Sequence, residues 1–171
     1  LPRKGIIELS RLLADDDVKV SIGSNHIRVT GGDYCFTSKL VDGAYPDYDR
    51  VVPKGGDKLV VGDREQLKQA FGRTAILSNE KYRGVRIELV SGAMHLVANN
   101  PEQEEAQEEV TVAYSGESLE IGFNVSYLLD VLNVLKSSEI RFTLADSNSS
   151  ALVEDASGES KATYVVMPMR L

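Results

Sequence analysis

The sequence predicts an α+β fold built from one repeat, a helix followed by an antiparallel β-meander, that occurs three times. Three observations support this prediction. Amphipathic helical segments recur about 60 residues apart in the 171-residue chain, each is followed by runs of alternating apolar and polar residues, and turn-forming residues separate those runs. The repeats share this pattern but have no obvious amino-acid sequence similarity. Packing such repeats together would place the helices on one face of the sheets.

The first repeat begins with a helix over about residues 3–14. Its apolar residues recur at helical spacing, at Ile6, Ile7, Leu9, Leu12 and Leu13. The acidic run Asp15, Asp16 and Asp17 is expected to end the helix. Alternating strands are then expected over residues 18–22, 26–30 and 33–40, with turns at 23–25 and 31–32.

The second repeat begins at Asp63, which suits a helix N-cap, and Gln66 three residues later completes a capping box. We expect a helix over about 63–77 and strands over 85–89, 94–98 and 110–114. The third helix starts after Asn124 and covers about 125–137, and its strands are expected over 139–144, 151–154 and 163–167.

One helix on one meander buries a single sheet face and leaves strand edges unpaired, so two repeats must pack to make a stable domain. Residues 48–171 hold two repeats and are predicted to form a complete domain, while residues 1–47 hold one and are predicted to be half of another. The chain starts with leucine and runs directly into a helix, so we expect it to be part of a longer protein.

The net charge of −7 argues against a simple nucleic-acid binder, because an acidic surface repels a duplex. The charge is nevertheless unevenly distributed. Lysine and arginine outnumber acidic residues on the first two predicted helices, and the excess acid lies in strands and loops. Ordinary decoration of a solvated face explains the charges of any single helix equally well.

The chain offers no convincing catalytic, metal-binding or cofactor-binding motif. His26 and His95 have no metal-ligand spacing to each other or to Cys35, and the glycine pairs at 31–32 and 55–56 lack the context of a phosphate-binding loop. Cys35 cannot form an internal disulfide and lies in a strand-like run, where a thiol acts as a small apolar residue. With no signal-peptide pattern and no apolar run long enough for a bilayer, the sequence predicts a cytoplasmic protein without a membrane partner.

Several strings resemble one known family, at residues 36–43, 45–48, 75–81, 98–104 and 164–171. All are similar to the bacterial DNA sliding clamp, the beta subunit of DNA polymerase III. The resemblance implies a clamp fold and a processivity factor: two crescent subunits of three domains each close into a ring around double-stranded DNA, with helices inside and sheets outside. This chain would contain the second half of the middle domain and the whole last domain.

The resemblance also implies a row of helix residues that face DNA. Arg3 and Lys4 match family positions that touch DNA, and helix charge alone adds Arg11, Lys68, Arg73 and Lys136. Few and weak contacts with phosphates would permit sliding.

Members of the family dock partners through a short peptide with hydrophobic anchors, which enters a groove between the middle and last domains. The implied partners are the polymerase III alpha subunit, the clamp loader, and repair and translesion polymerases. Carried over by position, the groove would contain Pro46, Arg50, Val51, Tyr82, Asn124, Tyr127, Ser150, Val165, Val166, Met167, Pro168, Met169 and Arg170. Methionine supplies adaptable apolar surface. Tyr82 replaces a phenylalanine of the family and Asn148 an aliphatic residue, and residues 165–169 also suit an ordinary last strand.

Ring closure would use Ile76 and Leu77 as apolar contacts and Glu102, Glu105 and Glu108 as acidic ones, although a solvated loop and edge strand explain these glutamates as well. The basic partner surface would lie on the family's first domain, so we expect a homodimer for the whole protein and a monomer for this chain. The competing hypotheses are an enzyme, such as a nuclease or phosphotransferase, and a protein-binding scaffold with no DNA role. We predict a non-catalytic subunit that needs no cofactor.

Overall fold

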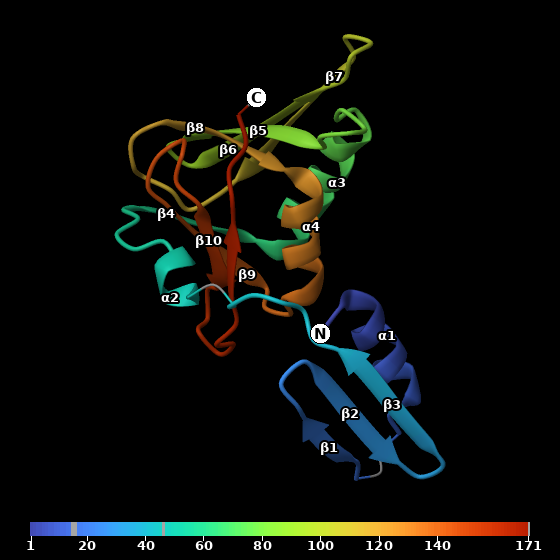
Figure 1. Ribbon diagram of the computed structural model, residues 1–171. Coiled ribbons are helices and arrows are strands. Elements are labelled where there is room, and N and C mark those ends of the chain that lie inside the picture. Colours follow the sequence, from blue (N-terminus) through green and yellow to red (C-terminus); the bar gives the residue numbers. More distant parts are fainter. Residues whose placement is uncertain (15–16, 46, 171) are drawn as a thin grey trace. The chain divides into compact units, whose positions relative to one another are not determined.

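A computed structural model describes residues 1–14, 17–45 and 47–170, and the chain forms two compact units, Leu1–Pro46 and Asp47–Leu171 (Figure 1). The predicted helix-ending residues Asp15 and Asp16 and the predicted groove residue Pro46 lie outside the described residues. The assignment of residues 1–47 to half a domain and of 48–171 to a whole one stays a prediction.

The first unit contains helix α1 (Arg3–Leu12) and an antiparallel sheet of β1 (Lys19–Ile22), β2 (His26–Gly31) and β3 (Tyr34–Lys39), in the order β1-β2-β3. The predicted helix and meander are confirmed, although the helix ends two residues early. Among residues 1–14 and 17–45, Val29 is the only buried hydrophobic side chain, and α1 itself buries none of its residues. The unit therefore has almost no core of its own.

The second unit contains, within residues 47–170, three helices and two four-stranded antiparallel sheets. The helices are α2 (Tyr48–Val51), α3 (Arg64–Ile76) and α4 (Val125–Val134). One sheet has the order β11-β10-β9-β4 and the other β7-β6-β5-β8. The strands are β4 (Lys58–Asp63), β5 (Gly84–Val90), β6 (Ala93–Asn99), β7 (Glu105–Thr111), β8 (Leu119–Asn124), β9 (Glu139–Leu144), β10 (Ala151–Asp155) and β11 (Thr163–Val166).

The sequence prediction missed α2, β4 and β8 and placed β7 too late in the chain. The strand expected over 110–114 runs instead from Glu105 to Thr111. Glu105 and Glu109 are exposed on this edge strand, and Glu108 on the other face meets α3, so a segment that reads as a polar loop pairs with β6. The third helix was expected to reach residue 137 but ends at Val134, which leaves Lys136 beyond it.

The two repeats of the second unit exchange strands. β4 precedes α3 but pairs with β9, which follows α4, and β8 precedes α4 but pairs with β5, which follows α3. A further link joins the sheets, because Val61 and Ala113 exchange backbone hydrogen bonds of 3.1 and 2.7 Å. Each sheet therefore needs both repeats, which is a stronger dependence than the packing of two independent modules.

The core of the second unit lies between the two helices and both sheets. α3 and α4 pack together, α3 also contacts β4, β6 and β7, and α4 contacts β8 and β11, so each helix joins one sheet to the other (Figure 1). Leu67 and Phe71 of α3 and Leu132 of α4 are fully buried. The predicted α+β fold is confirmed, with the amphipathic face of each helix turned to the core.

The ends of both long helices are held by hydrogen bonds that the sequence partly predicts. The Asp63 carboxylate accepts from the Gln66 backbone N–H at 2.8 Å, as expected for an N-cap. At the C-terminal end of α4, Arg64 of α3 donates to the carbonyl oxygens of Leu132 at 3.3 Å and Ser137 at 2.9 Å. Arg64 is one of the basic residues of the second predicted helix, and the structure shows that it links α3 to the end of α4.

Candidate functional site

The segment after β11 runs from one sheet of the second unit to the other. The Met169 backbone N–H donates to the Gly122 carbonyl on β8 at 2.8 Å, while β11 belongs to the sheet of β9 and β10. Met167 lies between these two anchor points, and 66% of it is exposed. We call residues Met167–Arg170 the tail.

Several predicted groove residues gather near this tail. Asn124 donates through its side chain to the Tyr82 carbonyl at 3.2 Å, and Tyr127 lies one turn into α4. Ala151 pairs with Val166 at the end of β10 and β11, and Ser150 and Met167 are the chain neighbours of this last pair. Tyr82, which lines one hollow together with Met169 and Arg170, is 55% exposed, and Tyr127 on α4 is 59% exposed, so both aromatic side chains stay in solvent.

Val166 and Arg50, two further predicted groove residues, lie in different environments. Val166 is 4% exposed and belongs to the core, because strand alternation turns it inward and leaves Val165 half-buried on the other face. The Val166 side chain therefore offers no surface to a peptide. Arg50 lies on α2 beside Val51 and forms an exposed ion pair of 3.3 Å with Asp47.

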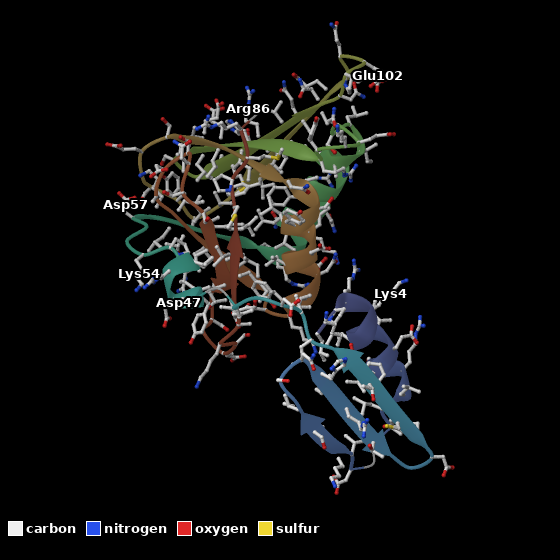
Figure 2. The ribbon with its side chains drawn as sticks, in the orientation of Figure 1. Lys4, Asp47, Lys54, Asp57, Arg86 and Glu102 are labelled. Carbon is white, nitrogen blue, oxygen red and sulfur yellow. The ribbon has the colours of Figure 1, made fainter. Side chains whose placement is uncertain are left out.

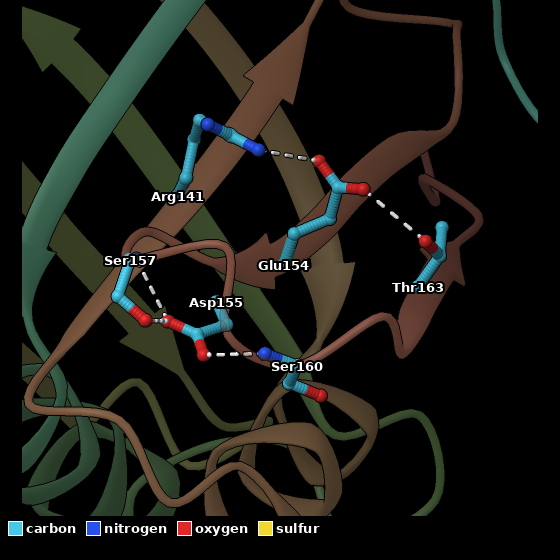
Figure 3. Close-up of polar contacts among 6 residues, drawn as sticks. All are labelled: Arg141, Glu154, Asp155, Ser157, Ser160 and Thr163. Carbon is cyan, nitrogen blue, oxygen red and sulfur yellow. Dashed lines mark hydrogen bonds and ion pairs between the residues drawn. The ribbon is translucent and has the colours of Figure 1, made fainter.

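A row of polar contacts holds the strands that precede the tail (Figure 3). Glu154 on β10 accepts from Arg141 on β9 and from Thr163 on β11, both at 3.1 Å. Next to it, the Asp155 carboxylate accepts from the hydroxyl and backbone N–H of Ser157 and from a backbone N–H farther along the loop. The Ser157 hydroxyl is the main cause that lowers the pKa of Asp155. These contacts fix the hairpin from which the tail emerges.

The predicted DNA-facing residues fall into different environments. Arg3 and Lys4 lie in the first turn of α1 and are exposed, and Lys4 projects into solvent in Figure 2. Arg11 pairs with Glu8 at 3.0 Å within the same helix. On α3, Lys68 is half-buried.

Arg73 and Glu108, predicted for two different surfaces, form an ion pair with each other. The Arg73 guanidinium donates to both oxygens of the Glu108 carboxylate, at 2.6 and 2.9 Å. The hydrogen bond from Arg73 is the main cause that lowers the pKa of Glu108. The charge of Arg73 is therefore largely compensated within the chain, and the pair ties α3 to β7.

The predicted interface residues lie at the edge of a sheet. β7 is the last strand in the order β7-β6-β5-β8 and contacts α3. Ile76 ends α3 and is 76% exposed, and Leu77 next to it is half-buried. Glu105 begins β7, and Glu102 lies in the projecting turn before it (Figure 2).

Comparison with known proteins assigns the chain to a family. Residues 49–170 match the family described as DNA polymerase III beta subunit, C-terminal domain, and residues 1–47 match the one described as its central domain. The chain belongs to the DNA polymerase III beta subunit family.

The relatives include the beta sliding clamp of Pseudomonas putida, 65% identical over 173 residues, and that of Escherichia coli K12, 58% identical. Both alignments cover 100% of this chain and 47% of the relative, so the chain spans about half the length of the curated clamps it matches.

Solved clamps have the same fold. The DNA polymerase III subunit beta of Pseudomonas aeruginosa superposes with a TM-score of 0.90 at 64% identity, covering 100% of this chain and 47% of that one. The Bartonella birtlesii clamp bound to griselimycin superposes at 0.88 with 39% identity, again over 100% and 47%. The predicted clamp fold is thereby confirmed.

Two further features of the described residues concern metal ligands and membrane spans. Residues 1–14, 17–45 and 47–170 contain no group of three or more side chains placed to hold a metal ion. None of the described helices is both long and apolar enough to cross a membrane.

Sequence reasoning missed Arg86, whose side chain lies on the outer face of β5 beside the tail (Figure 2). The alternation of β5, with Val85 and Ile87 buried, already indicates that Arg86 points outward. Its position under the tail depends on contacts between distant segments and has no local signal.

Proposed function

We propose that this chain is part of a DNA polymerase processivity factor. In the whole protein, two subunits close into a ring around duplex DNA, and the ring tethers polymerase III and docks the clamp loader and repair and translesion polymerases. The role is non-catalytic, and a cytoplasmic location stays a prediction. The match of the entire chain to beta sliding clamps, at up to 65% identity among the relatives described above, supports this proposal.

The observation that most favours peptide docking is the exposed apolar surface near the tail. Tyr82, Tyr127 and Met167 are each more than half exposed, although burying such side chains is favourable. A short peptide with hydrophobic anchors would bury them, and the flexible thioether of Met167 suits varied anchors. The groove proposed from the described residues retains Arg50, Val51, Tyr82, Asn124, Tyr127, Ser150, Val165 and the tail, and leaves out only the buried Val166.

A fluorescence polarisation assay tests this docking site. The probe is a fluorescein-labelled peptide with a leucine–phenylalanine anchor pair, and the protein is the whole subunit. We expect Met167→Ala to weaken binding about tenfold, because truncation of a central anchor contact commonly costs more than 1 kcal/mol. Leu59→Ala is the matched control, since Leu59 is exposed on β4, at the opposite edge of the sheet from β11. Equal affinities of the two variants would place the docking surface elsewhere.

For DNA, we propose that Arg3, Lys4 and Lys68 face the duplex and supply weak attraction to phosphates. Arg11 and Lys136 are weaker members of this set, since Arg11 pairs with Glu8 and Lys136 lies outside α4. Arg73 is assigned instead to the β7 edge, because Glu108 binds its guanidinium.

For ring closure, we propose that Ile76, Leu77, Glu102 and Glu105 meet the first domain of a second subunit along the open edge of β7. Glu108 would take part through the position it gives to Arg73. We expect this 171-residue chain to be monomeric in sedimentation velocity, because its residues match the central and C-terminal domains of the family and the proposed partner surface lies on the first. A stable dimer of the chain would contradict this assignment.

A further inference from the structure

A hollow of about 360 Å³ lies on the outer face of the β7-β6-β5-β8 sheet, beside the tail. Gly84 on β5 and Val97 on β6 line it, together with Tyr82 and Met169. Gly84 has no side chain to fill the space. The tail forms a rim there because the Met169 backbone N–H is bonded to Gly122 on β8.

The side of the hollow next to the tail is cationic. Arg86 and Arg170 both line it. The Arg86 Nε atom lies 3.5 Å from Glu120, a single contact between two well-exposed side chains, so the other donors of this guanidinium stay available. No carboxylate among the described residues lies within ion-pair distance of Arg170.

The acidic residue of the hollow stands on its opposite side. Glu105 belongs to β7, and β6 separates that strand from β5, which carries Arg86. The Glu105 carboxylate also accepts a hydrogen bond from the Gln107 side chain. Two strand spacings, about 10 Å, separate Glu105 from the strand of Arg86, so the side of the hollow next to the tail stays positive.

The hollow is continuous with the proposed docking groove, since Tyr82, Met169 and Arg170 belong to both. Its volume lies near the lower limit of ligand pockets, which suits one or two side chains better than a separate ligand. An acidic side chain fits the lining: guanidinium groups bind carboxylates through paired donors, and Val97 and Tyr82 can pack on its methylene groups.

We propose that this hollow is a flanking subsite of the docking groove, in which Arg86 and Arg170 bind an acidic residue next to the hydrophobic anchors of the docked peptide. This inference rests on the proposed docking function. It assigns to Arg86 a role in selecting among peptides that share the same anchors.

The test compares two labelled peptides that carry the same leucine–phenylalanine anchors and differ only in flanking residues, which are glutamate in one and glutamine in the other. Fluorescence polarisation with the whole subunit should show the glutamate peptide binding about two- to fivefold more tightly, the range expected for a partly exposed ion pair. The preference should disappear in Arg86→Gln. Glu120→Gln is the matched control, because it removes the negative charge next to Arg86 but keeps the guanidinium, and it should retain or increase the preference.

Each other outcome has a distinct meaning. Equal binding of both peptides to the wild type overturns the flanking subsite and leaves the groove standing, and so does a preference that persists in Arg86→Gln. Binding of neither peptide to the wild type overturns the proposed docking function itself. Matching thermal melts of the variants and the wild type exclude a loss of folding as the cause.

Discussion

The two units of the chain contain the same kinds of element but differ in how they bury them. The first unit, one helix on a three-stranded sheet, has Val29 as its only buried hydrophobic residue among those described. In the second unit two such repeats share strands, and Leu67, Phe71 and Leu132 are fully buried. The difference shows that one helix on one meander does not enclose a core. The core appears when a second repeat supplies both another helix and the fourth strand of each sheet.

Separating the units is the strongest test of this comparison. We expect residues 47–171 alone to unfold cooperatively on heating, because the large core lies within them. Residues 1–46 alone should show no cooperative transition, since they bury too little apolar surface to offset the entropy of ordering the chain. Circular dichroism melts of the two peptides make the measurement. A sharp transition in residues 1–46 would show that a single repeat is sufficient.

Core truncation gives the next largest effect. Phe71→Ala should lower the free energy of unfolding by about 3–5 kcal/mol, because the side chain is fully buried between the sheets. Ile22→Ala in the first unit should change it by less than about 0.5 kcal/mol, because Ile22 is largely exposed. Urea titrations of both variants measure the difference. Equal losses would mean that the first unit contributes a core comparable to that of the second.

The link from Arg64 to α4 should have an intermediate effect. Arg64→Met keeps much of the aliphatic stem but leaves the Leu132 and Ser137 carbonyls without this donor, at a cost of about 1–3 kcal/mol. The control Arg11→Met removes an exposed pair with Glu8 in the first unit and should cost less than about 0.5 kcal/mol. If urea midpoints show the same small shift for both, the Arg64 hydrogen bonds do not stabilise the junction of the two helices.

The smallest expected effect concerns the Arg73–Glu108 pair and depends on pH. Because Arg73 lowers the pKa of Glu108 in the folded state, the pair stabilises the fold fully above the ordinary glutamate pKa of about 4.3. This contribution is lost as the pH falls from there through the lowered pKa. Glu108→Gln should therefore melt slightly below the wild type at pH 7, and the gap should close in acid. A gap that stays constant down to pH 3 would assign the loss to packing and not to charge.

The sequence predicted most helices and strands because their signals are local. Asp63 and Asn124 mark helix starts, and alternation marks the hairpins. The exchange of β4 and β8 was missed because the partner of a strand is set by distant segments, and nothing within residues 58–63 or 119–124 specifies β9 or β5. The segment of β7 was misplaced because a strand so rich in glutamate, with Glu105 and Glu109 exposed at the sheet edge, looks like a loop.

The candidate site was predicted mainly through family resemblance, which takes no account of side-chain direction or of contacts between distant segments. Val166 was placed in the groove by position, but its side chain faces the core and that of its neighbour Val165 faces outward. Positional matching ignores which face of a strand a side chain occupies. The pairing of Arg73 with Glu108 could not be seen because 35 residues separate them and each was assigned from its own segment. Arg86 was missed because the hollow that it lines is formed together with Met169 and Arg170, which are distant in the sequence.

The register of the β11-β10-β9-β4 sheet has a mechanical consequence. Lys58 pairs with Leu144, Ala151 pairs with Val166, and the β9–β10 register brings Leu144 and Ala151 opposite each other. The polypeptide thus enters and leaves this sheet in one row, three strand spacings or about 14 Å apart. Tension applied between the segment before β4 and the tail would pull across the strands and break their hydrogen bonds in sequence. The second unit should therefore yield at low force when stretched through its own ends, even though its core is large.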